Sequence, residues 1–188
     1  CAAPDSSPRW STSPNSTSFF NSVFAGAGVA AAEYNVELTT EGAVTEEDYE
    51  AQNALTDQAV ENGADAIVIS AVDFHGNEEA VQRAADQGLP IVVIDSDVNS
   101  DDVICRIGTD NFAAGRMAAE TVLSGTEGLL SIGIVNFDEN TANGQERETG
   151  FREVVGESIR VKEVKTINVL STIEDARQGT RELIQENP

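Results

Sequence analysis

The sequence predicts an α/β fold with doubly wound parallel sheets. Short apolar runs such as residues 91–94 indicate buried parallel strands, because such strands are covered on both faces. Each run is followed by a turn and a helical segment. This strand-then-helix order recurs on both sides of residues 89–115, which we interpret as the joint between two lobes.

The expected N-terminal lobe covers residues 9–107, after a Pro- and Ser-rich tether at residues 1–8. Thr45, followed three residues later by Asp48, resembles a capping box, and Gly63 is a typical helix end. Residues 9–13 occupy the place of a first strand although their composition is poor for one. The expected elements after the tether are a strand at 9–13, a turn at 14–18, a helix at 19–34, a strand at 35–40, a helix at 45–62, a strand at 64–70, a helix at 76–86, and strands at 91–94 and 103–107.

The expected second lobe covers residues 108–188. Gly108-Thr109-Asp110-Asn111 forms a polar turn into an Ala-rich helix. The elements expected after that turn are a helix at 111–124, a strand at 129–136, a helix at 144–155, a strand at 159–169 and a last helix at 174–186.

Composition limits the classes of partner. The formal net charge is −22 and 40% of residues are hydrophobic, so a packed core is expected. Nucleic acid and anionic membrane surfaces repel such a charge, and an anionic ligand is disfavoured. Only Lys162 and Lys165 are lysines, so the acid excess fits either a halophilic protein, whose charges are screened by salt, or an ordinary acidic secreted protein.

The two cysteines are predicted to differ in role. Cys105 alternates with apolar residues in an expected strand, which indicates a buried core thiol. Cys1 precedes the tether, and a chain that starts at Cys is typical of a mature lipoprotein, so we expect a lipid anchor there. The alternative is an artificial boundary of the sequence. No apolar run is long enough to span a bilayer.

Motifs for catalysis are absent from the sequence. No GxGxxG follows the first expected strand, no P-loop occurs, and no Cys/His cluster has metal-ligand spacing. With His75 as the single histidine, a His-based triad has little basis. We therefore expect a protein that is not an enzyme and that uses neither a cofactor nor a metal.

Four residues carry side chains suited to a hydroxyl-rich ligand. Asp95 lies at the carboxyl end of a buried strand, where open α/β sheets bind ligands, and a carboxylate accepts hydrogen bonds from two adjacent hydroxyls. Phe19 and Phe20 start a helix, and an aromatic ring stacks on the apolar face of a sugar. Arg147 is expected in the first turn of a helix, where the helix dipole disfavours a cation. A ligand contact is therefore favoured over a structural role for Arg147.

From about residue 11 onward the chain resembles the type I periplasmic sugar-binding proteins of ABC transporters. The segments that carry the resemblance are residues 16–20 with the Ala-Gly-Ala helix that follows, residues 63–69, residues 88–97, residues 108–111 and residues 145–152.

The resemblance implies a hinged, two-lobed trap for a sugar or polyol, recognised in its closed state by a membrane permease. It implies ligand contacts by Asp95 and the Phe pair from one lobe, and by Arg147 from the other. Ser70 and Thr109 match polar contact positions, while Thr17 stands where the family often has Asn. Asp97 is expected to shape a turn, and Ser96 stands where ribose binders have Arg.

The same resemblance implies a C-terminal lobe that continues beyond residue 188, so we expect a truncated chain. The function favoured by the sequence is extracytoplasmic capture of a neutral sugar or polyol for an ABC importer. Alternatives are the effector domain of a LacI-type transcription regulator and a sensor ectodomain. The acidic start at Cys1 supplies neither the helix-turn-helix nor the basic surface that the regulator needs.

Overall fold

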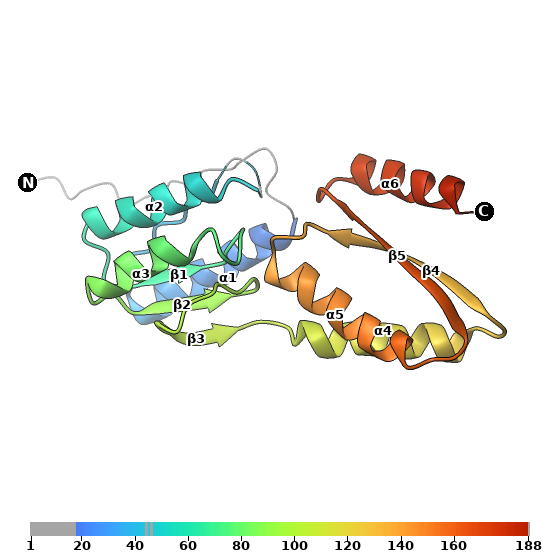
Figure 1. Cartoon of the computed structure of the whole chain (residues 1–188). Coiled ribbons are helices and arrows are strands. Elements are labelled where there is room, and N and C mark those ends of the chain that lie inside the picture. The colour runs from blue at the N-terminus through green and yellow to red at the C-terminus, as the bar shows by residue number, and fades with distance from the viewer. Residues whose placement is uncertain (1–17, 44, 46, 188) are drawn as a thin grey trace, which may run out of the picture.

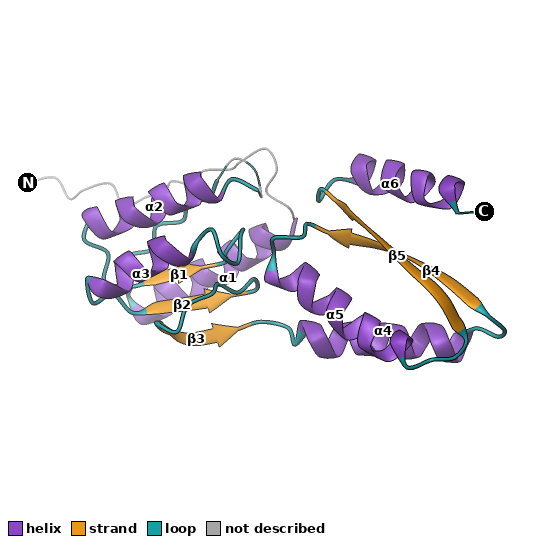
Figure 2. Cartoon of the chain, viewed as in Figure 1, coloured by secondary structure: helices purple, strands orange, loops and turns teal. Residues whose placement is uncertain are grey.

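Parallel strands form two separate sheets in the computed structural model, which describes residues 18–43, 45 and 47–187. The expected α/β class is confirmed, and helices lie beside both sheets (Figures 1 and 2). The first unit contains α1 (Ser18–Tyr34), α2 (Tyr49–Glu61), β1 (Ile67–Ile69), α3 (Glu78–Asp86), β2 (Ile91–Ile94) and β3 (Val103–Ile107). The second unit contains α4 (Asn111–Gly125), β4 (Leu130–Phe137), α5 (Ala142–Gly156), β5 (Val161–Val169) and α6 (Ile173–Glu186).

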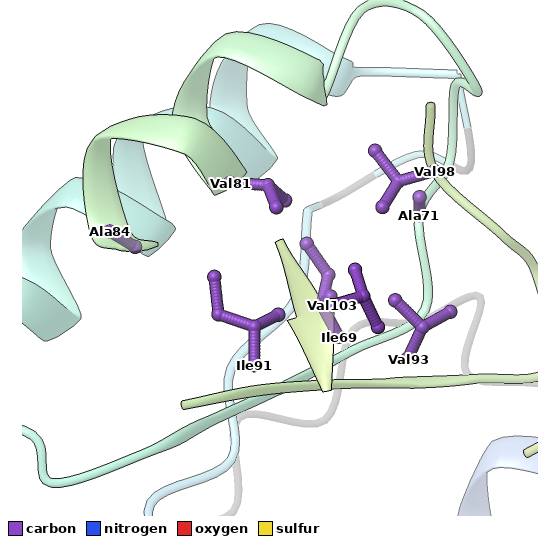
Figure 3. Packing of buried hydrophobic residues seen from close by; sticks show 8 residues of the cluster. All are labelled: Ile69, Ala71, Val81, Ala84, Ile91, Val93, Val98 and Val103. Atoms are coloured by element: carbon purple, nitrogen blue, oxygen red, sulfur yellow. The ribbon is translucent and has the colours of Figure 1, made fainter. Parts of the chain in front are cut away.

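The first sheet has the order β1-β2-β3 and packs one apolar face against α3. Ile67 pairs with Ile91, and Ile91 with Val103, so apolar side chains from three strands share that face. Val81 and Ala84 of α3 point toward them (Figure 3). Ile91 and Ala84 are fully buried, which identifies this contact as the core of the unit.

The opposite face of the first sheet is only partly covered, and this corrects the prediction of a buried Cys105. Cys105 is exposed, and its neighbours Ile104 and Ile107 are 68% and 60% exposed. On β1, Val68 is 62% exposed. The alternation that indicated a strand at residues 103–107 was sound, but it could not show which face of the sheet is covered.

Two further expectations in the first unit are wrong. Residues 35–40 have the alternation of a strand but form none, and their expected neighbour at residues 9–13 lies outside the described residues. Helix α2 begins at Tyr49 with Asp48, not Thr45, as its N-cap. The carboxylate of Asp48 accepts a hydrogen bond from the Ala51 backbone N–H at 2.9 Å, which satisfies the helix start. The expected helix end is confirmed, with Gly63 at φ +78°.

Some expectations fall outside the described residues. These are the tether at residues 1–8 with Cys1, the strand at 9–13, and Thr17 in the turn before α1.

In the second unit, α5 and α6 cover opposite faces of the two-stranded sheet (Figure 1). Asn136 of β4 donates to Glu148 of α5 at 3.2 Å. A Cβ at Gly133, three residues earlier and therefore on the other face, would lie 2.7 Å from Leu183 of α6. The alternation of β4 thus places its two faces against different helices.

Helices α4 and α5 meet with their backbones in contact. A methyl group at Gly115 would overlap the carbonyl oxygen of Arg147, and one at Gly150 would overlap the carbonyl oxygen of Phe112. Only a residue without a Cβ permits this approach. The two glycines therefore set the distance and register between the helices.

A polar cluster attaches α5 to the second sheet. The Glu148 carboxylate accepts hydrogen bonds from Thr166 Oγ1 and Arg152 Nε, both at 2.6 Å, and from Asn136. Partial burial acts to raise the pKa of the Glu148 carboxyl, but the hydrogen bonds and the Arg152 charge outweigh it and hold that pKa below its usual value.

Within the described part of the chain, none of the helices is long and apolar enough to cross a lipid bilayer.

We predict that alanine at Gly115 or Gly150 lowers the free energy of unfolding by about 1–3 kcal/mol, because the added methyl group forces the helices apart. Urea unfolding measures this. Gly125→Ala and Gly156→Ala are matched controls on the same helices, since a Cβ there meets nothing within 4 Å. The controls should leave stability unchanged or raise it by up to about 1 kcal/mol. Equal losses at all four positions would contradict the contact.

We also predict that Glu148→Gln destabilises the chain at neutral pH and that the loss shrinks in acid. A carboxyl whose folded pKa is lowered contributes stability above its unfolded pKa, and this is lost as the pH falls through the folded pKa. Urea unfolding at about pH 7 and about pH 3 measures the difference between parent and variant. A loss that is the same at both pH values would exclude an ionised Glu148 in the cluster.

Candidate functional site

Asp95 follows β2 directly and has a backbone conformation that is unusual for a residue with a side chain. Its φ is +58°, in the left-handed region, which costs most residues with a side chain about 1–2 kcal/mol and costs Asp and Asn less. Its N–H donates to the carbonyl oxygen of Ile107 at 2.9 Å, which ties the end of β2 to the end of β3. The backbone from which the half-buried carboxylate extends is therefore fixed at the sheet edge.

A cavity of about 360 Å³ lies beside this edge. The chain crosses there from β3 into α4, and the start of α5 also borders the cavity. The lining residues are Val93, Asp95, Asp97, Arg106, Ile107, Gly108, Thr109, Asp110, Asn111, Phe112, Asn143 and Glu146. Two of the residues predicted from the sequence, Asp95 and Thr109, therefore line the same cavity.

The charged groups of the cavity differ in whether they already have a hydrogen-bond or ion-pair partner in the protein. Nε of Arg106 lies 2.8 and 2.9 Å from the two carboxylate oxygens of Asp97, and this pair joins the β2–β3 loop to β3. Asp110 caps α4 through a 2.8 Å hydrogen bond from the Ala113 N–H. Asp97 also accepts from the Val98 N–H at 2.8 Å, in agreement with its expected role in the turn. The Asp95 carboxylate makes no hydrogen bond with any described residue.

Arg147 contacts a wall of this cavity through Asn111. Nε of Arg147 donates to Oδ1 of Asn111 at 2.7 Å, and Nδ2 of Asn111 donates to Oδ1 of Asn143 at 3.0 Å. Because α5 begins at Ala142, Arg147 lies in the second helical turn, and its expected place in the first turn is wrong. The helix dipole therefore no longer argues for a ligand contact by Arg147. The hydrogen bond to Asn111, which lines the cavity, now supports that role.

Among the described residues, the other predicted side chains do not line this cavity. Phe19 is 50% exposed and stacks edge-to-face on Phe20, with ring centroids 5.2 Å apart. The carbonyl oxygen of Ser70 accepts from Nε2 of Gln52 at 2.9 Å. Ser96 is 6% exposed, and its hydroxyl makes no hydrogen bond with the described residues. Thr17 lies outside those residues.

A backbone hydrogen bond links the two units near the cavity. The Phe74 N–H, in the loop after β1, donates to the carbonyl oxygen of Asn140 before α5 at 2.9 Å. The Phe74 carbonyl accepts from the Asn99 N–H at 2.8 Å. Figure 1 shows α5 beginning close to the first unit. The loops after β1, β2 and β4 are thus joined through one residue.

Sequence reasoning missed the asparagines of the cavity wall. Asn111 belongs to the polar turn into α4. Asn143 precedes Arg147 by four residues, so Asn143 and Arg147 lie on one face of α5. That spacing was a usable signal. The pairing of Arg106 with Asp97 had no signal, because it depends on the path of the β2–β3 loop.

The described residues hold no group of three or more His, Cys, Asp or Glu side chains that could bind a metal ion. The chemistry available at the cavity is hydrogen bonding by carboxylate, amide, hydroxyl and guanidinium groups.

Comparisons with known proteins identify the family of the chain. The family described as the periplasmic binding protein domain matches residues 10–188. A D-ribose/D-allose-binding protein of Pseudomonas aeruginosa is 26% identical over 125 residues, which are 63% of this chain and 39% of that protein.

Two solved structures share the fold. The periplasmic component of an ABC-type sugar transport system from Hahella chejuensis has a TM-score of 0.87 at 23% identity, over 94% of this chain and 65% of that one. A carbohydrate transporter solute-binding protein from Agrobacterium radiobacter, in complex with D-arabinose, has a TM-score of 0.84 at 27% identity, over 93% of this chain and 61% of that one. The chain therefore spans about two fifths of the curated relative and less than two thirds of each structure.

The backbone at Asp95 allows a prediction that needs no ligand. Asp95→Asn should leave the free energy of unfolding nearly unchanged, because asparagine tolerates the left-handed region. Asp95→Val should lower it by about 1–2 kcal/mol, since a β-branched residue is strained there. Chemical unfolding of the two variants decides this, and equal stability would show that the positive φ is not retained in solution.

Proposed function

The chain belongs to the periplasmic binding protein family, and from that membership we propose that it captures a neutral sugar or polyol outside the cytoplasm for an ABC importer. The observation that carries the proposal is the joint itself. There, Asp95 at the end of β2 and Asn111 at the start of α4 border one cavity, and Asn111 accepts a hydrogen bond from Arg147 of α5. The names of the relatives support a sugar as the class of ligand, and the family is one of solute-binding proteins rather than enzymes.

In this proposal Asp95 accepts hydrogen bonds from two neighbouring hydroxyls, and Arg147 donates to the same ligand from the second unit. Thr109 contributes a hydroxyl at the crossing between the units. Phe19, Phe20, Ser70 and Thr17 remain proposed contacts on the first unit, assigned by the resemblance of their motifs. Residues 9–107 and 108–188 would then act as two lobes that close on the ligand.

The charge of the cavity favours a neutral ligand over an anionic one. Carboxylates outnumber guanidinium groups along its wall, and the Arg106 guanidinium is engaged by Asp97. An added negative charge would therefore face uncompensated repulsion in addition to the net charge of −22. Sugar phosphates and sugar acids should bind more weakly than the parent sugars.

Placement at the membrane is part of the same proposal. A lipid on Cys1, followed by the tether at residues 1–8, would hold the protein on the outer face of the cell membrane beside its permease. The acidic composition would suit a salt-rich medium, where the surface charges are screened.

The proposal predicts a thermal shift with one neutral sugar or polyol, and loss of that shift in Asp95→Asn and Arg147→Gln. A ligand at about 100 times its dissociation constant adds roughly 2.7 kcal/mol to the free energy of unfolding. The screen uses the chain with neutral, acidic and phosphorylated sugars, in low and in molar salt.

Asp57→Asn and Arg177→Gln are matched controls, because each removes the same charge from an exposed ion pair outside the cavity lining. Both controls should keep the shift. The absence of a shift with every sugar, from a chain that unfolds cooperatively, would reject sugar capture by these 188 residues.

A further inference from the structure

We infer that Asn111 is a positioning residue that fixes the orientation of the Arg147 guanidinium toward the ligand. The inference rests on the proposed function in so far as Arg147 touches a sugar. The fixing itself is a property of the protein without ligand and can be tested by itself.

The first observation is the burial of Asn111 and the use of both ends of its amide. Asn111 is 3% exposed, so water cannot readily replace its partners. Its Oδ1 accepts from Nε of Arg147 at 2.7 Å, and its Nδ2 donates to Oδ1 of Asn143 at 3.0 Å. Asn143 and Arg147 are separated by one turn of α5. Asn111 therefore contacts α5 at two points, and neither contact is easily exchanged for another.

The second observation is the fixed distance between the helices that carry these side chains. Gly115 lies one turn after Asn111 on α4, and its backbone contacts the carbonyl oxygen of Arg147 itself. The contact of Gly150 with Phe112 repeats this one turn further along α5. Because the backbones already touch, α4 and α5 cannot approach further or slide without overlap. The short Asn111 side chain thus meets Arg147 at a distance that the backbone sets.

The third observation concerns the part of Arg147 that stays available. The guanidinium is planar. Once the Nε–H is held by Asn111, the two Nη atoms can move only by rotation about the axis of that hydrogen bond. Among the described residues, no hydrogen bond engages either Nη atom of Arg147. Each Nη carries two N–H donors, and these can meet the hydroxyl or ring oxygens of a sugar.

Ordering a long side chain on binding costs affinity. Asn111 removes part of that cost before the ligand arrives. We therefore expect Asn111→Leu, which keeps the size but removes both hydrogen bonds, to weaken sugar binding by about tenfold, as expected for a lost bond to a charged group. Asn111→Asp retains the acceptor for Arg147 Nε and should stay within about threefold of the parent.

The decisive measurement is hydrogen exchange of the Arg147 Nε–H, followed by ¹⁵N NMR on the chain without ligand. In the parent and in Asn111→Asp this proton should exchange slowly. In Asn111→Leu its exchange should accelerate by about tenfold or more, because the acceptor is gone. Arg152 is an internal control on α5, since its Nε donates to Glu148 at 2.6 Å, and its exchange should stay unchanged if α5 keeps its fold.

Each outcome has a distinct meaning. Accelerated exchange at Arg147 alone, with weakened sugar binding in Asn111→Leu, supports the inference. Exchange in the parent that is as fast as in Asn111→Leu overturns it, as does unchanged sugar affinity in a variant whose Arg147 has been released. If the parent binds no sugar, the proposed function fails, while the exchange measurement still decides whether Asn111 holds Arg147.

Discussion

The backbone contact between α4 and α5 is the constraint on which the site depends. Gly115 and Gly150 let the helices meet with their main chains in contact, and the first turn of α4 is thereby placed against the second turn of α5. Asn111 and Arg147 face each other as a result. The polar cluster around Glu148 then attaches the pair of helices to the second sheet. These contacts connect the second sheet, α4, α5 and the cavity wall to one another.

In the first unit, the aliphatic core fixes the sheet edge at which Asp95 lies. Its core of aliphatic side chains between α3 and the strands holds the carboxyl ends of β2 and β3 in register, and Asp95 is tied to Ile107 across that edge. The left-handed backbone at Asp95 costs stability that the packed sheet supplies.

Much of the fold could be predicted from the sequence because local residue patterns determine most of its helices and strands. An apolar run predicted β2, alternation predicted β3, and the polar turn at residues 108–111 predicted the start of α4. Predictions failed where a second segment decides the result. The burial of Cys105 depends on what covers its face of the sheet, and residues 35–40 depend on a neighbouring strand. Asp95 could be predicted from its place at the end of a strand, and Thr109 from the family resemblance. The contact of Arg147 with Asn111 depends on the packing of α5 against α4 and could not be foreseen.

The link from the Phe74 N–H to the Asn140 carbonyl joins the two units through main-chain atoms alone. Such a link does not depend on which side chains the two loops carry, proline at position 74 excepted, because proline has no N–H. Side-chain substitutions can therefore accumulate in these loops without breaking this hydrogen bond. The link between the two units can therefore persist during evolution while the side chains around it change.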